Sequence, residues 1–253
     1  MTLLNEETRR KLRELNFSEL IDAFEIQSQD IHYASLLFED RIKMAVDYVY
    51  QKKYNSKVQS LIKLSKFRIS NAVMSDVYYN ERGLDHQRLM ILSSCQFIDT
   101  SSSVILHGFT GSGKSYLACA IGRQACMQGI RTRYIRIPDL LILRDEAATI
   151  KQGVSKLLKK FASYKLLILD EWLLDSLTAE EQHFLFELIE RRHDCSSTIF
   201  CTQFKKEEWH ARLGGGVHAD AMMDRIVHNV IWVYSGNINM REYLAVKNNL
   251  FES

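Results

Sequence analysis

Apolar residues follow two different patterns along the chain, and the change between them falls near residue 95. Before it, apolar side chains recur at mostly helical spacing, as Leu12, Leu15, Leu20, Ile21 and Phe24 do. From residue 103 onward, short apolar runs alternate with helical stretches, and the runs read SVILHGF, TRYIRI, KLLILDE, STIFCTQ and NVIWVYSG. Such runs, rich in Ile, Val and Leu, are typical of a parallel sheet covered by helices on both faces.

This change predicts two domains, a small all-helical domain over residues 1–97 and an α/β domain over residues 98–253. Pro138 is the only proline, so no proline-rich linker marks the boundary. Glycine is more informative, because six of the eleven glycines fall in two clusters, at residues 108–113 and 214–216. Clustered glycines indicate a backbone that needs unusual angles or that approaches another group closely.

Composition narrows the class of protein. Of the 253 residues, 46% are hydrophobic and 25% are charged, with a formal net charge of +2, which excludes a histone-like or strongly acidic chain. No apolar stretch approaches the roughly 18–20 residues that span a bilayer, and the polar start MTLLNEETRRKL is unlike a secretory signal. The five cysteines form no CxxC pair, which favours reduced thiols over disulfides or a zinc site. We therefore expect a cytoplasmic protein that does not bind membranes.

The segment GFTGSGKS, Gly108 to Ser115, fits the P-loop pattern, with a strand-like run before it and a helix-like run after it. In such a loop the backbone N–H groups and the start of the helix bind phosphate oxygens, Lys114 adds a positive charge, and the Ser115 hydroxyl ligates Mg²⁺. A plain glycine turn is the alternative, but the strand–loop–helix context favours a site for ATP and Mg²⁺. The expected nucleotide-binding residues of the loop are Gly108, Phe109, Thr110, Gly111, Ser112, Gly113, Lys114, Ser115 and Tyr116.

A second element, LLILDE, is an apolar run that ends in Asp170 and Glu171. The end of a buried parallel strand places Asp170 at the sheet edge where ligands bind, and we expect it to hold Mg²⁺ together with Ser115. Glu171 is expected to polarise the attacking water, which favours hydrolysis over transfer of phosphate to a metabolite. An ordinary strand end capped by acids is the alternative.

Polar residues also end the run STIFCTQ. If this strand lies between the P-loop strand and the LLILDE strand, its end lies beside the γ-phosphate. Gln203 is then the expected polar sensor that orients the water, with Thr202 as the second choice. A strand-end amide with a purely structural role remains an alternative.

Arg225, in the stretch HADAMMDRIVHNVIWV, is a candidate arginine finger that reaches the nucleotide of a neighbouring subunit. Its alternative is an ion pair with Asp224 on a solvated helix face. Arg241, after the last strand, is a candidate contact to nucleotide or DNA, although a solvated surface role is favoured.

In this order the segments GFTGSGKS, LLILDE, CTQ and DAMMDRIVH resemble the IstB-like AAA+ ATPases, helper proteins encoded beside insertion-sequence transposases and related to DnaC-type helicase loaders. The stretch LDHQRLMILSSCQFI and Trp209 fit the same family. The resemblance implies a P-loop AAA+ fold of the ASCE type, with a five-stranded parallel sheet and no C-terminal lid domain. It also implies ATP-dependent assembly of a homo-oligomer on double-stranded DNA and assistance to a transposase. The segment GNINMR departs from the usual G-x-S-Y-R, which leaves the role of Arg241 open.

The stretch from residue 41 to residue 68 holds eight basic residues and one acid, a local charge of +7. Such a concentration suits contacts to DNA phosphates without sequence preference. The candidate DNA-binding residues are Lys52, Lys53, Lys57, Lys63, Lys66 and Arg68. A second lysine cluster covers residues 151–165, and a solvated amphipathic helix is the alternative for both.

The leading hypothesis is an ATPase that assembles on duplex DNA and regulates a transposase. A replicative helicase loader with the same ATPase core is the nearest alternative. A nucleotide-gated scaffold and a metabolite kinase are less favoured, because neither needs the Glu171 carboxylate.

Overall fold

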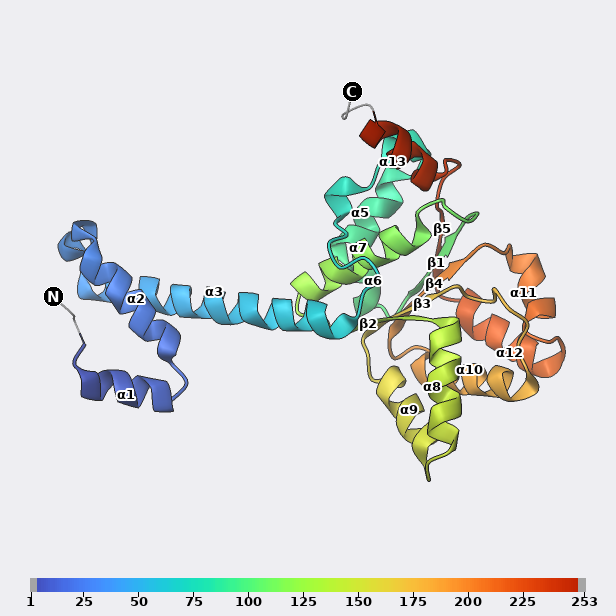
Figure 1. Cartoon of the computed structure of the whole chain (residues 1–253), viewed down its shortest axis with the longest axis horizontal. Coiled ribbons are helices and arrows are strands. Elements are labelled where there is room, and N and C mark those ends of the chain that lie inside the picture. The colour runs from blue at the N-terminus through green and yellow to red at the C-terminus, as the bar shows by residue number, and fades with distance from the viewer. Residues whose placement is uncertain (1–3, 250–253) are drawn as a thin grey trace. The chain divides into compact units, whose positions relative to one another are not determined.

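The computed structural model describes residues 4–249 and separates the chain into two compact units, one ending at Ser60 and one beginning at Leu61 (Figure 1). The first unit is helical. It contains α1 (Glu6–Glu14), α2 (Ser18–Gln29), the 3-10 helix η1 (Ile31–Ser35) and most of α3 (Phe38–Ser65).

Polar contacts hold the helices of the first unit together around a small core. The Lys52 ammonium pairs with Asp22 at 2.6 Å, and the Gln27 amide donates to the Arg41 carbonyl at 2.7 Å, so that α2 is attached to α3 at two points. Only a few apolar side chains of this unit are fully covered, and Ile21 and Ala45 are among them. The unit therefore has the helical character that the periodicity predicts.

The second unit is built on a five-stranded sheet in the order β2-β3-β4-β1-β5, and every paired strand runs parallel. The strands are β1 (Ser103–His107), β2 (Thr132–Arg136), β3 (Leu166–Asp170), β4 (Ser197–Thr202) and β5 (Val230–Tyr234). These are the five apolar runs of the sequence, and β4 lies between β1 and β3 as expected. The predicted α/β architecture is confirmed.

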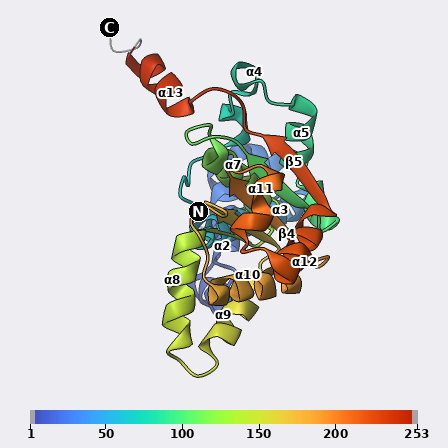
Figure 2. The ribbon, with the colours of Figure 1, turned by 90° about the vertical axis from the view of Figure 1, so that its right-hand side faces the viewer.

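Helices cover both faces of this sheet (Figure 1). One face packs against α5 (His86–Ser94), α6 (Gln96–Asp99) and α7 (Lys114–Met127). The short helices η2 (Met74–Asp76) and α4 (Tyr79–Arg82) precede α5 in the chain. The opposite face carries α8 (Ile137–Ala148), α9 (Gly153–Ala162), α10 (Ala179–Arg192), α11 (Lys206–Arg212) and α12 (Gly216–Val227). Figure 2 shows α8 and α9 side by side next to α10.

The compact units do not divide where we predicted, after residue 97. Side chains of the helices in residues 61–97, such as Leu89 and Leu92, lie in one core cluster with Val104 and Leu106 of β1. These helices cover one face of the sheet and belong to its unit. Helical periodicity cannot separate a helix that packs on a sheet from a helix of another unit, because both have one apolar face.

After β5 the described chain contains one helix, α13 (Met240–Asn249), and its first residue is tied to the P-loop. The Met240 amide donates to the Gly111 carbonyl at 2.9 Å. None of the helices within residues 4–249 is long and apolar enough to cross a membrane.

Candidate functional site: the P-loop and the acidic end of β3

The P-loop joins β1 to α7 in the conformation that a phosphate cradle requires. Gly111 and Gly113 have φ values of +90° and +86°, a region that side-chain-bearing residues rarely adopt. A Cβ atom at Gly111 would lie 2.4 Å from Oδ1 of Asn239, so a larger residue here would also have to displace that side chain. Helix α7 begins at Lys114, which directs its N-terminal N–H groups and positive dipole end at the loop.

The Lys114 ammonium folds back over the loop and donates to two carbonyl oxygens, those of Gly108 at 2.7 Å and Phe109 at 2.8 Å. Burial lowers the pKa of Lys114 below its usual value. The side chain therefore places a partly desolvated charge at the P-loop, and such a charge next to backbone N–H groups binds polyphosphate strongly.

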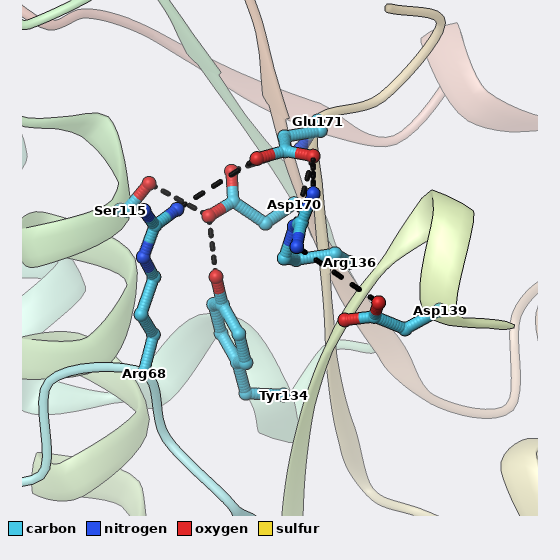
Figure 3. Close-up of polar contacts among 7 residues, drawn as sticks. All are labelled: Arg68, Ser115, Tyr134, Arg136, Asp139, Asp170 and Glu171. Atoms are coloured by element: carbon cyan, nitrogen blue, oxygen red, sulfur yellow. Dashed lines mark hydrogen bonds and ion pairs between the residues drawn. The ribbon is translucent and has the colours of Figure 1, made fainter. Parts of the chain in front are cut away.

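Ser115 and Asp170, which are far apart in sequence, meet at the end of β3. The Ser115 hydroxyl donates to Oδ2 of Asp170 at 2.6 Å, and the buried Tyr134 hydroxyl donates to the same oxygen at 2.6 Å (Figure 3). Burial is the main reason that the pKa of Tyr134 lies far above its usual value, with Asp170 as the next cause. Tyr134 therefore remains a proton donor to the carboxylate.

This set of donors fits Mg²⁺. A hydroxyl and one carboxylate are hard oxygen ligands, and Mg²⁺ in nucleotide sites commonly takes one or two protein ligands together with phosphate oxygens and water. No cluster of three or more His, Cys, Asp or Glu with the spacing of a metal site occurs in residues 4–249, so the structure offers no competing metal cage there.

Glu171 follows directly after β3 and is held by two arginines (Figure 3). Arg136 approaches Oε2 with Nε at 2.9 Å and Nη2 at 2.8 Å, and Nη1 of Arg68 lies 3.7 Å from Oε1. The backbone of Glu171 is left-handed, with φ of +59°, which turns the chain sharply at the strand end. Asp170 and Glu171 consequently point to different partners, as their expected roles require.

At the end of β4 the structure separates the two candidate sensors. Thr202 is buried, and its hydroxyl donates to the Trp172 carbonyl at 3.1 Å. This hydrogen bond connects the end of β4 to the segment that follows β3. The Gln203 side chain is half-buried and accepts a hydrogen bond from the Thr110 hydroxyl of the P-loop at 3.0 Å. This contact favours Gln203 over Thr202 as the residue that contacts nucleotide.

Arg225 lies at the opposite edge of the sheet from the P-loop. It borders a cavity together with Ser103 and Thr198, at the amino ends of β1 and β4, whereas the P-loop follows the carboxyl end of β1. Its guanidinium pairs with Glu190 of α10, rather than with Asp224. Arg225 is therefore not positioned to reach the nucleotide site of its own subunit.

The candidate DNA-binding residues differ in what they contact. Within the first unit, Lys52 pairs with Asp22, Lys53 donates to the Asn16 carbonyl at 2.8 Å, and Lys57 is exposed. Within the second unit Lys63 and Lys66 are exposed, but Arg68 points at Glu171. The exposed lysines remain candidates for phosphate contacts, whereas Arg68 lies beside Glu171 at the acidic end of β3.

Three residues around the site were missed by sequence reasoning, namely Arg82, Tyr134 and Arg136. The buried guanidinium of Arg82 donates to the carbonyls of Ser112 and Ser235, each at 2.7 Å, and burial lowers its pKa to about 10. No local pattern marks Arg82 or Tyr134. Arg136 ends the strand β2, so the strand-end argument that selected Gln203 would have selected it as well.

A family of known proteins matches most of the chain. Residues 10–247 match the profile of the family described as IstB-like ATP binding protein. The chain is 34% identical over 218 residues to the insertion sequence ATP-binding protein y4pL of Sinorhizobium fredii, and the match covers 84% of each chain. It is 31% identical over 205 residues to the ATP-binding protein of insertion sequence IS1162 from Pseudomonas fluorescens, covering 79% of this chain and 87% of the relative.

Solved structures share the fold. The crystal structure of a DNA replication initiation factor superposes with a TM-score of 0.58 at 18% identity, covering 72% of this chain and 55% of that one. The DnaC helicase loader superposes with a TM-score of 0.53 at 20% identity, covering 65% of this chain and 96% of the loader. The second unit thus shares the parallel α/β fold of these solved structures.

Proposed function

The chain belongs to the IstB-like ATP-binding protein family, and on this premise we propose that it is a Mg²⁺-dependent ATPase that assembles on double-stranded DNA and assists a transposase. The observation that carries the ATPase proposal is the hydrogen bond between Ser115 and Asp170, with Glu171 beside it. This contact joins the P-loop to the acidic end of β3, the two parts that ATP hydrolysis needs.

Each residue of the proposed site has its own role in ATP hydrolysis. The P-loop N–H groups and Lys114 bind and neutralise the phosphates, while Ser115 and Asp170 hold Mg²⁺. Bound Mg²⁺ would supply charge stabilisation at the phosphate oxygens. Glu171 accepts a proton from the attacking water, so that ATP and water give ADP and phosphate, and Gln203 orients that water from the P-loop side.

Glu171 can act as a base only when its carboxylate is available to water. In the described state both carboxylate oxygens face arginines, Oε2 toward Arg136 and Oε1 toward Arg68. We therefore expect slow basal hydrolysis, with acceleration by a ligand or partner that rearranges these contacts.

The position of Arg225 supports action between subunits. Since it lies at the sheet edge opposite the P-loop of its own chain, a role as an arginine finger requires a second copy. We therefore propose a homo-oligomer in which Arg225 completes the nucleotide site of the adjacent subunit.

DNA and transposase are proposed as partners on different grounds. The exposed Lys57 of the first unit and the exposed Lys63 and Lys66 of the second carry positive charge suited to DNA phosphates. The relatives named as insertion-sequence ATP-binding proteins favour a transposase over a replicative helicase. The likeness to the DnaC loader concerns the fold and does not favour a helicase as partner.

The central test is steady-state ATP hydrolysis by the purified protein with and without long duplex DNA, at low and moderate salt. We expect hydrolysis to rise with DNA and this stimulation to fade as salt increases. Lys114→Ala should abolish ATP binding, and Glu171→Gln should retain it while lowering hydrolysis by about 100-fold or more. Lys11→Ala, which removes an exposed lysine of α1, is the matched control. ATP binding by Lys114→Ala equal to the wild type would contradict the proposed site.

Subunit mixing tests the role of Arg225. The Lys114→Ala variant keeps Arg225 but has a defective P-loop. The Arg225→Ala variant keeps an intact P-loop but lacks the arginine. A mixture of the two inactive variants should recover hydrolysis if Arg225 acts on a neighbouring subunit. An inactive mixture of variants that still co-assemble would argue against action between subunits.

Partner identity is tested by capture. We expect immobilised protein to retain a transposase encoded next to it in an insertion sequence and not a replicative helicase. Capture of the helicase alone would support the alternative function of a helicase loader.

A further inference from the structure

The chain leaves α3 along a path that is fixed at three successive residues. The buried Ser65 hydroxyl donates to the Thr132 carbonyl at 3.0 Å, which anchors the end of the helix to the start of β2. Lys66 follows the last residue of α3 and adopts a left-handed conformation, with φ of +56°. The buried Phe67 ring then packs on α7 at Gly122, where an added Cβ atom would lie 2.6 Å from Cε1 of Phe67. These contacts of Ser65 and Phe67 fix the backbone position of the following residue, Arg68, next to α7.

The Arg68 side chain extends toward Ser115 and Asp170, the two residues that are expected to hold Mg²⁺ (Figure 3). Figure 3 shows its guanidinium directed toward Ser115 and the two carboxylates at the end of β3. Arg68 borders a cavity of about 280 Å³ together with Lys114 and Ser115, which are the phosphate and metal residues of the proposed site. A second cation thus lies at the place where a triphosphate is expected.

The contact that Arg68 makes in this state is easily exchanged. Its distance to Oε1 of Glu171 is 3.7 Å, and 49% of the side chain is exposed, so the pair contributes little to stability. Glu171 keeps its closer contact with Arg136 at the other oxygen when Arg68 leaves. A guanidinium forms paired hydrogen bonds to phosphate as readily as to carboxylate, and a triphosphate offers more negative charge.

We propose that Arg68 binds the terminal phosphate of ATP in the P-loop of the same subunit, and that this exchange releases Oε1 of Glu171 for the attacking water. The proposal rests on the proposed ATPase function and assigns Arg68 to nucleotide rather than to DNA. If so, the contacts of Arg68, which lies just after the end of α3, differ between the ATP-bound and the ADP-bound protein.

The test compares the binding of fluorescent ATP and ADP analogues, in Mg²⁺, to the full chain and to variants. Arg68→Ala should weaken ATP binding by about tenfold or more and ADP binding by less than about threefold, because only ATP carries the terminal phosphate. Arg68→Lys should fall between the wild type and Arg68→Ala, since it keeps the charge and loses the paired geometry. Arg191→Ala is the matched control, because it removes another partly exposed arginine from a glutamate pair, at 3.3 Å, on α10. DNA affinity without nucleotide should be unchanged in Arg68→Ala.

Two results would overturn the proposal, namely ATP affinity of Arg68→Ala within about twofold of the wild type, and equal weakening of ATP and ADP. Loss of DNA affinity with intact ATP affinity would return Arg68 to the DNA-binding residues and leave the ATPase function standing. The failure of the ATPase function itself has a different signature, which is nucleotide binding by Lys114→Ala equal to that of the wild type. Urea unfolding of each variant separates a folding defect from a binding defect, and Arg68→Lys provides a second variant if Arg68→Ala does not fold.

Discussion

Tyr134 and Asp170, on the neighbouring strands β2 and β3, share a hydrogen bond of 2.6 Å that fixes one oxygen of the candidate metal-binding carboxylate. The Ser115 hydroxyl donates to that same oxygen, and the Glu171 amide donates to the other at 2.9 Å. These three hydrogen bonds come from β2, from α7 and from the residue that follows β3. The buried Tyr134 side chain therefore helps to set the orientation of Asp170, the residue that is expected to bind Mg²⁺.

Tyr134→Phe removes this hydrogen bond and leaves the ring in place. We expect the free energy of unfolding to fall by about 1.5–3 kcal/mol, the usual value for a hydrogen bond to a charged group. The Mg²⁺ concentration that gives half-maximal ATP hydrolysis should rise, because the carboxylate is less well oriented. Urea unfolding and a Mg²⁺ titration measure the two effects, and Tyr50→Phe at an exposed site is the control. An unchanged Mg²⁺ requirement would limit Tyr134 to a role in stability.

Gly122→Ala tests the packing that fixes the α3 exit. Alanine favours a helix over glycine by about 1 kcal/mol, but its Cβ atom would lie 2.6 Å from the Phe67 ring and 2.7 Å from Cδ1 of Ile168. Overpacking of this kind costs about 1–3 kcal/mol, so we expect the variant to be less stable than the wild type. Phe67→Leu in the same chain should recover part of the loss. A stabilising effect of Gly122→Ala alone, measured by urea unfolding, would contradict the close contact.

His107 ends β1 just before the P-loop and should make stability depend on pH. Burial first, and then the Lys114 charge, lower its pKa below 6.5. Between the lowered folded pKa and 6.5 the unfolded chain binds more protons, so this contribution to stability is complete above pH 6.5 and is lost as pH falls through the folded value. The decrease in urea midpoint from pH 7.5 to pH 5 should be smaller in His107→Gln than in the wild type. Equal decreases in the two proteins would exclude His107 as a source.

The cysteines should differ sharply in reactivity. Cys195 is exposed, whereas Cys95, Cys119, Cys126 and Cys201 are buried. Burial raises the pKa of the Cys95 and Cys119 thiols to about 11, which further suppresses their reactive thiolate form. A thiol reagent should therefore label one site rapidly in the native protein and the others only after unfolding. Cys195→Ser should abolish the rapid phase, and a rapid phase that persists in this variant would show that a buried thiol becomes accessible.

Local patterns were sufficient to predict several features of the fold and the candidate site. The five apolar runs predict the five strands, and the spacing of Gly108, Gly113 and Lys114 between a strand and a helix predicts the P-loop. These features can be recognised in the sequence because strand composition, helical periodicity and the glycine requirement of a tight loop each depend on a few neighbouring residues. The strand-end argument also anticipates that Asp170 lies beside Ser115, since parallel strands end at one edge.

The sequence by itself therefore determined the elements, their parallel arrangement and the main candidates for phosphate and metal binding. Only the tertiary structure decided that residues 61–97 belong to the sheet unit, that Tyr134 donates to Asp170, and that Arg68 and Arg136 hold Glu171. The physical reason is that these side-chain contacts join residues 35 to 103 positions apart in the chain, and each depends on how the helices and strands pack together. A buried arginine or tyrosine has no characteristic neighbours in sequence, because its partners are chosen by the fold and not by the adjacent residues.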